Sequence, residues 1–316
     1  MSSTQMTTPG TGSFASEHLV EADDLRHRVQ PGVPTRDSLF WNLILPDEQV
    51  GVQLYAFGDG RGLGGRQVVV YRPEPEPMIM HSTLGHDLGD DSDFDDWRCA
   101  GMRVRQPEPL RTAQVDYASD EVSLEYTFTA THRPFSYLEN AYFPHWMAAN
   151  RYEQTGLASG TLRVGEREIR FQDVWTHRDH SWGRRHWTWP HHWKWLVAGT
   201  PSGQAINAMI SIARGEVGVN GYVLRDGQPV ALVVARARAE YDEAMGQVRL
   251  EADLIDVEGR TTTLEMERYA LFTMSFGSDS VVNEAACRVR IDGEEGTGQF
   301  EARWPRAYLQ GLVDAE

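Results

Sequence analysis

The feature that most constrains the fold is an alternation of apolar and polar residues with a period of two. It is clearest from position 248, where apolar residues alternate with charged ones: Val248, Leu250, Ala252 and Leu254 against Arg249, Glu251 and Asp253. Successive side chains of a β-strand point to opposite faces, so this pattern predicts a strand with one buried face. Cys287, Val289 and Ile291 repeat the pattern and predict a second such strand.

Turn-forming dipeptides separate the strand segments at short intervals. Asp226-Gly227 and Asp292-Gly293 are typical of two-residue hairpin loops, because Asp and Gly accept positive φ angles. Further strands are expected over residues 122–131, 162–171 and 230–237, with a joint at Gly165-Glu166 and a short terminal helix over 304–314. Many short strands with close turns predict antiparallel meanders, and therefore an all-β barrel or sandwich with few short helices.

Charge and hydropathy exclude several classes of partner. The chain has 316 residues and a formal net charge of -16, which would repel the phosphates of a nucleic acid. It contains no apolar run of about 18 residues, so no integral membrane contact is expected. Cys99 and Cys287 are too few and too far apart for a disulfide framework or a zinc motif. Residues 1–16 are polar and are expected to form a disordered tail without a secretory signal, which makes a cytoplasmic location the default.

The most unusual segment of the chain is residues 173–195. It holds six of the ten tryptophans and five of the eleven histidines, together with Arg178, Asp179, Arg184 and Arg185. Hydration of an alkene, or loss of water from an alcohol, passes through a carbocation-like state. Such a reaction needs a proton donor, which a carboxylic acid in an apolar setting supplies, and π faces that stabilise positive charge.

Asp179 between His177, His180 and Trp182 offers these parts within a few residues. A structural role is an equal alternative, in which Asp179 forms a buried ion pair with Arg178 or Arg185. The tryptophans at 187, 189, 193 and 195 alternate, and they belong either to a packed core or to the wall of a pocket.

A metal site and a cofactor are not expected from the sequence. His177 and His180 are three residues apart, and the adjacent His191 and His192 would point to opposite faces of a strand. A zinc or iron site would therefore need ligands that converge from elsewhere, for example His81, His86 or Asp173. The glycines of residues 60–65 are not followed by a helix pattern, so a turn explains them better than a dinucleotide site.

Several short motifs resemble one known superfamily. They are Tyr152-Glu153-Gln154-Thr155-Gly156, Ser159-Gly160-Thr161, Arg178-Asp179-His180-Ser181-Trp182-Gly183 and Asn283-Glu284-Ala285. With these motifs the chain resembles, over residues 35–305, the carotenoid 1,2-hydratase (hydroxyneurosporene synthase) and AttH-like superfamily, and within it an uncharacterised bacterial branch. The sequence departs from that pattern at His177 and Arg178, where relatives often have glycine and a small residue.

The resemblance implies a fold and a set of activities. It implies two lipocalin-like antiparallel β-barrel domains in tandem, which we place at residues 17–168 and 169–316. Characterised relatives include hydratases of isoprenoid double bonds and pericyclase-type enzymes, and others have no known catalysis. For the site, the resemblance implies that Asp179 is the candidate acid, with His177, His180 and Trp182 around it.

The combined prediction is a cofactor-independent hydratase, dehydratase or cyclase/isomerase that acts on an apolar terpenoid-like molecule. Asp179 would be the general acid, and His177 or His180 would relay the proton or hold water. The expected substrate-binding residues are Trp182, Trp187, Trp195, Tyr152, Arg185 and Glu284. One alternative is a lipocalin-type carrier of an apolar ligand without catalysis, and another is a structural domain whose tryptophans form its core. The oligomeric state is left open.

Overall fold

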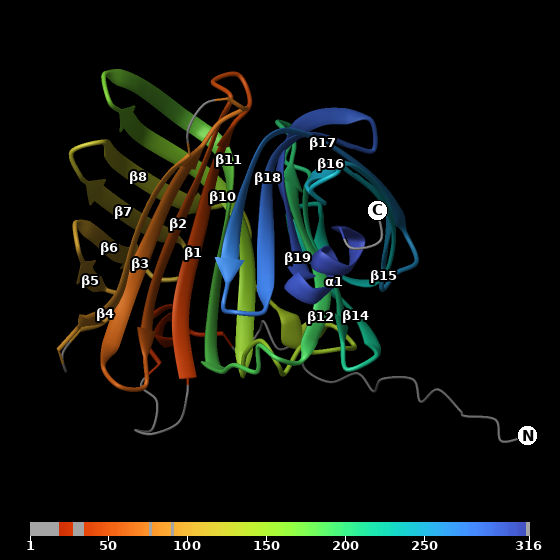
Figure 1. Cartoon of the computed structure of the whole chain (residues 1–316), viewed down its shortest axis with the longest axis horizontal. Helices are drawn as coiled ribbons and strands as arrows, with labels where there is room; N and C mark the ends of the chain where they lie inside the picture. Colours follow the sequence, from red (N-terminus) through yellow and green to blue (C-terminus); the bar gives the residue numbers. More distant parts are fainter. Residues whose placement is uncertain (1–18, 28–34, 76–77, 90–91, 314–316) are drawn as a thin grey trace, which may run out of the picture.

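The computed structural model describes residues 19–27, 35–75, 78–89 and 92–313. The expected tail at residues 1–16 lies outside the described residues. The described chain folds into two antiparallel β-sheets that lie side by side, with the N-terminal sheet in red to green and the C-terminal barrel in green to blue (Figure 1). This confirms the all-β class with two barrel-like units that the resemblance implied.

The first sheet has eleven strands and nearly closes on itself. Its strands are β1 (Thr35–Leu45), β2 (Val50–Asp59), β3 (Leu63–Tyr71), β4 (Ile79–Asp87), β5 (Asp96–Cys99), β6 (Met102–Glu108), β7 (Thr112–Ala118), β8 (Val122–Ala130), β9 (Phe135–Ser136), β10 (Asn150–Val164) and β11 (Arg167–Arg184). The order is β4-β3-β2-β1-β11-β10-β8-β7-β6-β5, and β9 pairs with β10. Strand β11 is thus central, between β1 and β10.

The second sheet is a closed barrel of eight consecutive strands. They are β12 (Pro190–Gly199), β13 (Ala205–Ala213), β14 (Glu216–Arg225), β15 (Gln228–Tyr241), β16 (Gln247–Asp256), β17 (Thr261–Phe276), β18 (Ser280–Ile291) and β19 (Glu294–Pro305). The described helices are short, namely the 3-10 turns η2 (Glu21–Asp24) and η3 (Tyr137–Glu139) and the terminal helix α1 (Arg306–Val313). Within the described residues, none of these is long and apolar enough to cross a membrane.

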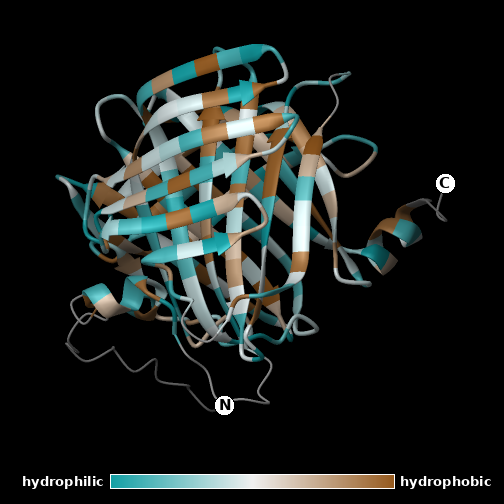
Figure 2. Cartoon of the chain, turned by 90° about the vertical axis from the view of Figure 1, so that its left-hand side faces the viewer, coloured by the Kyte–Doolittle hydropathy of each residue, from teal (hydrophilic) through white to brown (hydrophobic). Residues whose placement is uncertain are grey.

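The period-two alternation decides which side chains form the cores. Leu250, Ala252 and Leu254 of β16 are buried inside the barrel, whereas Arg249 and Glu251 are exposed. Hydrophilic and hydrophobic bands alternate in the same way along the strands of the first sheet (Figure 2). Two further apolar clusters lie between the sheets, where Ile44, Val69 and Tyr71 of the first sheet meet Phe272 and Ala286 of the barrel, and where Phe40 and Trp195 meet.

The predicted hairpins and strands are largely present. Asp226, Gly227, Asp292 and Gly293 all have positive φ angles, as their two-residue loops require. The strand expected over residues 162–171 was wrong, because the chain turns at Gly165 between β10 and β11. The turn-forming dipeptide Gly165-Glu166 divides the apolar residues on either side of it between two strands.

The division between the sheets falls after β11. Strand β11 pairs with β10 from Arg167 to Trp182 and with β1 from Arg178 to Arg184, and the first barrel strand begins at Pro190. We therefore propose that the boundary between the two units lies within residues 185–189, in place of the expected division at 168 and 169. That the two units are separate folding domains stays a prediction.

Candidate functional site between the two sheets

The Arg178–Gly183 hexapeptide lies in the central strand β11, and strand geometry divides its side chains between two faces. Cross-strand partners share a face, and the register pairs Asp179 with Glu153 and His180 with Tyr152. Contacts show that His177 and Asp179 face the barrel, whereas Arg178, His180 and Trp182 face the interior of the first sheet. The hexapeptide therefore contributes to two sites on opposite sides of one strand.

Asp179 is buried at the face that meets the barrel. The Nη2 atom of Arg151 lies 2.9 Å from its Oδ2. Burial raises the pKa of Asp179 to about 7, with further raising contributions from Glu153 and Glu301, and Arg151 and Arg185 offset only part of this. A substantial fraction of the Asp179 carboxyl is therefore protonated at neutral pH, as a general acid requires. The alternative ion pair with Arg178 is not formed, because that side chain points to the other face and binds Asp24.

Glu153 connects the charged groups on this face. Its Oε2 atom lies 2.8 Å from His177 Nε2, and its Oε1 atom accepts a hydrogen bond of 2.6 Å from Arg151 Nε. Trp195 of the barrel also donates its Nε1–H to Glu153 at 3.3 Å. Burial opposes ionisation of Glu153, but Arg151 and His177 outweigh it and lower the pKa of Glu153. Burial likewise lowers the pKa of His177, so the imidazole is neutral at pH 7.

The barrel contributes a second pair of carboxyl groups. Glu284 of β18 and Glu301 of β19 are direct cross-strand partners. Burial raises the pKa of both groups, and in Glu284 the negative charge of Glu301 adds to the effect. Gln299 donates a hydrogen bond of 2.8 Å to Glu284, and Trp193 donates its indole N–H to Glu301. These groups place two buried carboxyls with raised pKa values opposite the Asp179 face of β11.

Aromatic side chains surround the charged groups between the sheets. Trp195 lies edge-on to His177 and to Phe40, with ring centroids 5.6 Å apart in both cases. The ring centroids of Trp187 and Phe276 lie 4.9 Å apart, and Trp187 belongs to a cluster that includes Trp146 and Trp193. The guanidinium of Arg185 lies 5.8 Å from the Trp187 ring centre and donates to the Ser181 carbonyl oxygen at 2.9 Å.

The other face of β11 holds the remaining predicted site residues. His180 Nε2 lies 2.6 Å from Asp37 Oδ1, Tyr152 donates its hydroxyl to Asp24, and the half-buried Trp182 stacks on His27 with centroids 3.9 Å apart. The expected grouping of Asp179, His180, Trp182 and Tyr152 around one pocket is thus not formed. Strand alternation separates these residues from Asp179, and their expected roles in catalysis and substrate binding stay predictions.

The metal ligands suggested by the sequence do not converge. His81 contacts Tyr117 and Glu121 at the edge of the first sheet, and the exposed Asp173 contacts Ser159. Within the described residues, one group of three possible ligands lies close together, namely His27, Asp37 and His180.

An open groove on the first sheet is a separate feature. It has a volume of about 1020 Å³ and is lined by residues of β6, β7, β8, β10 and β11 that include Arg105, Asp116, Arg163 and Glu168. Its charges pair with one another, as in Arg105 with Asp116 at 2.6 Å. None of the predicted site residues lines this groove, so we do not assign the acid–base chemistry to it.

Sequence reasoning missed the partners of Asp179. Arg151, Glu153 and Glu301 were not among the predicted site residues, although Glu153 lies in one of the quoted motifs. The signal that would have found Glu153 is the β10–β11 hairpin around Gly165, since its register places Glu153 opposite Asp179. Glu301 belongs to a distant barrel strand, and no local pattern points to it.

Comparisons with known proteins agree on the fold. A family model described as a domain of unknown function (DUF7064) matches residues 20–306. None of the curated proteins matches the chain. Kievitone hydratase from Nectria haematococca is similar in structure, with a TM-score of 0.62 and 13% identity over 94% of this chain and 95% of that chain.

Two further solved structures share this architecture. A protein described as an AttH from Nitrosomonas europaea has a TM-score of 0.59 and 11% identity, over 95% of this chain and 98% of that chain. CghA in complex with Sch210972 has a TM-score of 0.60 and 13% identity, over 85% of this chain and 88% of that chain. At these identities the likeness establishes the shared fold of two β-sheets and leaves the activity open.

Proposed function

The chain belongs to the DUF7064 family, and we propose that it is a cofactor-independent acid–base enzyme, a hydratase, dehydratase or cyclase/isomerase of an apolar terpenoid-like molecule. The reaction takes place between the two sheets, on the barrel-facing side of β11. The observation that carries the proposal is Asp179, a buried carboxyl whose pKa is raised to about 7 and which lies beside Arg151. Perturbed carboxyls of this kind are typical of general acids.

In the hydration direction, protonated Asp179 donates its proton to one carbon of a substrate double bond. The other carbon becomes electron-deficient, and Arg151 stabilises the carboxylate that Asp179 leaves behind. Water then forms the new C–O bond at the cationic carbon, and its surplus proton returns to the Asp179 carboxylate, either directly or by way of Glu153. Dehydration is the same sequence in reverse. In cyclisation an internal double bond forms a C–C bond with the cationic carbon, and the new cation then loses a proton to the Asp179 carboxylate.

The surroundings of Asp179 suit a cationic transition state. The negative charge of Glu153 is held in place by Arg151 and His177, and it lies directly across the strand pair from Asp179. Trp195 presents an indole ring beside His177, and aromatic faces stabilise nearby positive charge. The aromatic side chains between the sheets favour an apolar substrate over a charged one.

One structural neighbour adds support for the reaction class. Kievitone hydratase is by its name a hydratase, and it shares the two-sheet architecture over 95% of its length. Because fold likeness alone does not establish activity, the residues around Asp179 carry the proposal and the neighbour only supports it.

The proposal is tested by replacing Asp179. Asp179→Asn keeps the size of the side chain and removes the transferable proton, so conversion of substrate should fall by at least about 100-fold. The substrate is sought by incubating the protein with a mixed terpenoid pool and following each component by liquid chromatography and mass spectrometry. Native mass spectrometry of the variant should still detect the bound ligand.

Asp173→Asn is the matched control for this experiment. Asp173 lies on the same strand but is exposed, and Asn tolerates its φ of 50°. The control should convert substrate like the wild type. Full conversion by Asp179→Asn would refute the proposal. A ligand that wild type binds and releases unchanged would favour the alternative of a hydrophobic-ligand carrier.

A further inference from the structure

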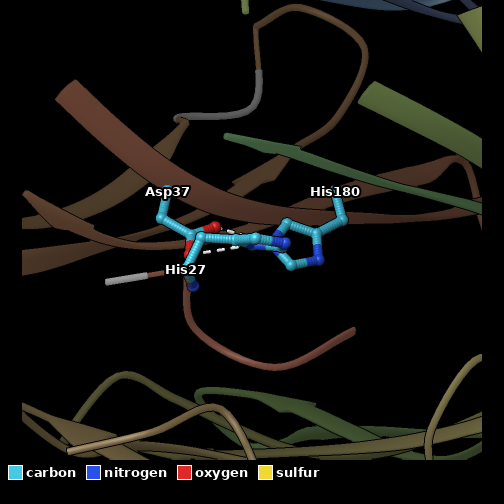
Figure 3. A group of neighbouring side chains, drawn as sticks. All are labelled: His27, Asp37 and His180. Carbon is cyan, nitrogen blue, oxygen red and sulfur yellow. Dashed lines mark hydrogen bonds and ion pairs between the residues drawn. The ribbon is translucent and has the colours of Figure 1, made fainter. Parts of the chain in front are cut away.

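Three side chains from separate segments meet on the inner face of the first sheet, away from Asp179. His27 follows the turn η2, Asp37 lies in β1 and His180 lies in β11. Figure 3 shows both imidazole rings directed at the Asp37 carboxylate. His180 Nε2 lies 2.6 Å from Asp37 Oδ1, and His27 Nδ1 lies 3.4 Å from Asp37 Oδ2. One possible ligand atom of each residue lies within 4.8 Å of those of the other two.

Two of these groups are buried and His27 is half-buried, and the set is incompletely hydrogen-bonded. Asp37 is 1% exposed and His180 is fully buried. The Nδ1 atoms of His27 and His180 are both buried, and neither has a hydrogen-bond partner among the described residues. A buried imidazole nitrogen without a partner is costly, unless another ligand occupies its lone pair. Of the two nitrogens, His27 Nδ1 is the one directed at the Asp37 carboxylate, at 3.4 Å.

The second ring nitrogen of each histidine faces another carboxylate. His27 Nε2 lies 3.4 Å from Asp23 Oδ1, and His180 Nδ1 lies 4.0 Å from Asp24 Oδ1. Histidines that bind metals usually direct their other nitrogen at a carboxylate, which fixes the ring and strengthens the ligand. His27 has this arrangement with Asp23 of η2, whereas the 4.0 Å between His180 Nδ1 and Asp24 is too long for a hydrogen bond.

We propose that His27 Nδ1, Asp37 and His180 Nε2 bind one divalent transition metal ion, with Zn²⁺ as the best fit. Imidazole and carboxylate together suit Zn²⁺ better than Mg²⁺ or Ca²⁺, which prefer oxygen ligands. Zinc bonds of 2.0–2.1 Å place tetrahedral ligand atoms about 3.3 Å apart, close to the 3.4 Å between His27 Nδ1 and Asp37. The His180–Asp37 contact of 2.6 Å would open by about 0.7 Å to admit the ion.

Such an ion would fasten the segment around η2 to β1 and β11. This segment already binds Arg178 through Asp24. The ion would add a second attachment at His180, two residues further along β11. The site lies on the opposite face of β11 from Asp179. Its occupancy is therefore separable from the proposed acid–base chemistry.

The test uses the untagged full-length protein, treated with EDTA and dialysed into metal-free buffer. Titration with Zn²⁺ alone, followed by calorimetry and thermal unfolding, should show one bound equivalent and a raised Tm. Co²⁺ alone should give the intense visible absorption of a tetrahedral N/O site. His27→Gln should weaken Zn²⁺ binding at least about 100-fold and abolish that spectrum.

Controls separate this site from adventitious binding by other histidines. His27 is half-buried, so His27→Gln should keep the fold, which is checked by an unchanged Tm in EDTA. His191→Gln removes an exposed histidine next to His192 and should bind Zn²⁺ like the wild type. Absence of a bound equivalent in wild type, wild-type affinity in His27→Gln, or loss of binding in His191→Gln would each overturn the proposal and leave a metal-free His–Asp pair.

Discussion

At the residue scale, the chemistry of Asp179 depends on partners that the local sequence does not show. The segment 173–195 identified Asp179 as a candidate acid, and its raised pKa agrees with that role. Its ion-pair partner is Arg151 from β10, however, whereas the sequence suggested Arg178 or Arg185. Whether a carboxyl is protonated depends on burial and on charges from other strands, so residue type alone cannot determine it.

The raised pKa of Asp179 predicts a pH dependence of stability. The folded state holds this proton up to pH about 7, whereas an unfolded Asp releases it near its usual value of 3.8. Between these values the folded state binds more protons, so the free energy of unfolding falls as pH rises. From pH 5 to pH 8 the wild type should therefore lose about 2–3 kcal/mol more than Asp179→Asn.

Urea unfolding of both proteins at the two pH values measures this difference. Glu284 and Glu301 also have raised pKa values, and their own burial is common to both proteins. The repulsion between Glu301 and the Asp179 carboxylate is absent from the variant and is part of the difference that the comparison measures. An identical loss in wild type and variant would show that Asp179 is ionised throughout this pH range.

At the element scale, the faces of β11 explain what could and could not be predicted. The alternation of apolar and charged residues identified β16 and the end of β18, and the Asp-Gly dipeptides identified two hairpins. Residues 173–195 lack such a clean pattern, because both faces of β11 are buried and both carry polar groups. The sequence therefore suggested a single cluster of site residues around Asp179, whereas strand alternation divides these residues between the two faces of β11.

The buried pair of Arg178 and Asp24 should be essential for attaching η2 to β11. Both side chains are fully buried, and their charged atoms lie 3.2 Å apart. Replacing Arg178 with Met leaves the Asp24 charge buried without its cation, which should lower the free energy of unfolding by about 3–5 kcal/mol. Urea denaturation with far-UV circular dichroism measures the loss.

Arg170→Met is the control, since Arg170 lies on the same strand with 82% of its side chain exposed. Its effect should stay within about 0.5 kcal/mol. Adding Asp24→Asn to Arg178→Met should recover part of the stability, because the unpaired charge is then removed. Equal stability of Arg178→Met and Arg170→Met would show that the pair does not hold the segment in place.

At the scale of the whole molecule, two β-sheets bury charged groups where they meet. Glu153 and Arg151 come from the first sheet, and Glu284 and Glu301 come from the barrel. The meanders predicted an all-β fold, and the resemblance added the two-barrel architecture. The contact between the sheets joins residues more than 100 positions apart, such as Asn42 and Gln299, and periodicity carries no information about such pairs.

The most direct test of the account asks whether Asp179 changes a bound apolar molecule chemically. The protein is incubated with a mixed terpenoid pool in ordinary and oxygen-18 water, and the extracted small molecules are analysed by mass spectrometry. We predict that wild type and Asp173→Asn yield a product that gains labelled oxygen, loses water or is isomerised, and that Asp179→Asn yields only the starting molecule. A ligand recovered unchanged from wild type, or altered equally by Asp179→Asn, would contradict the account.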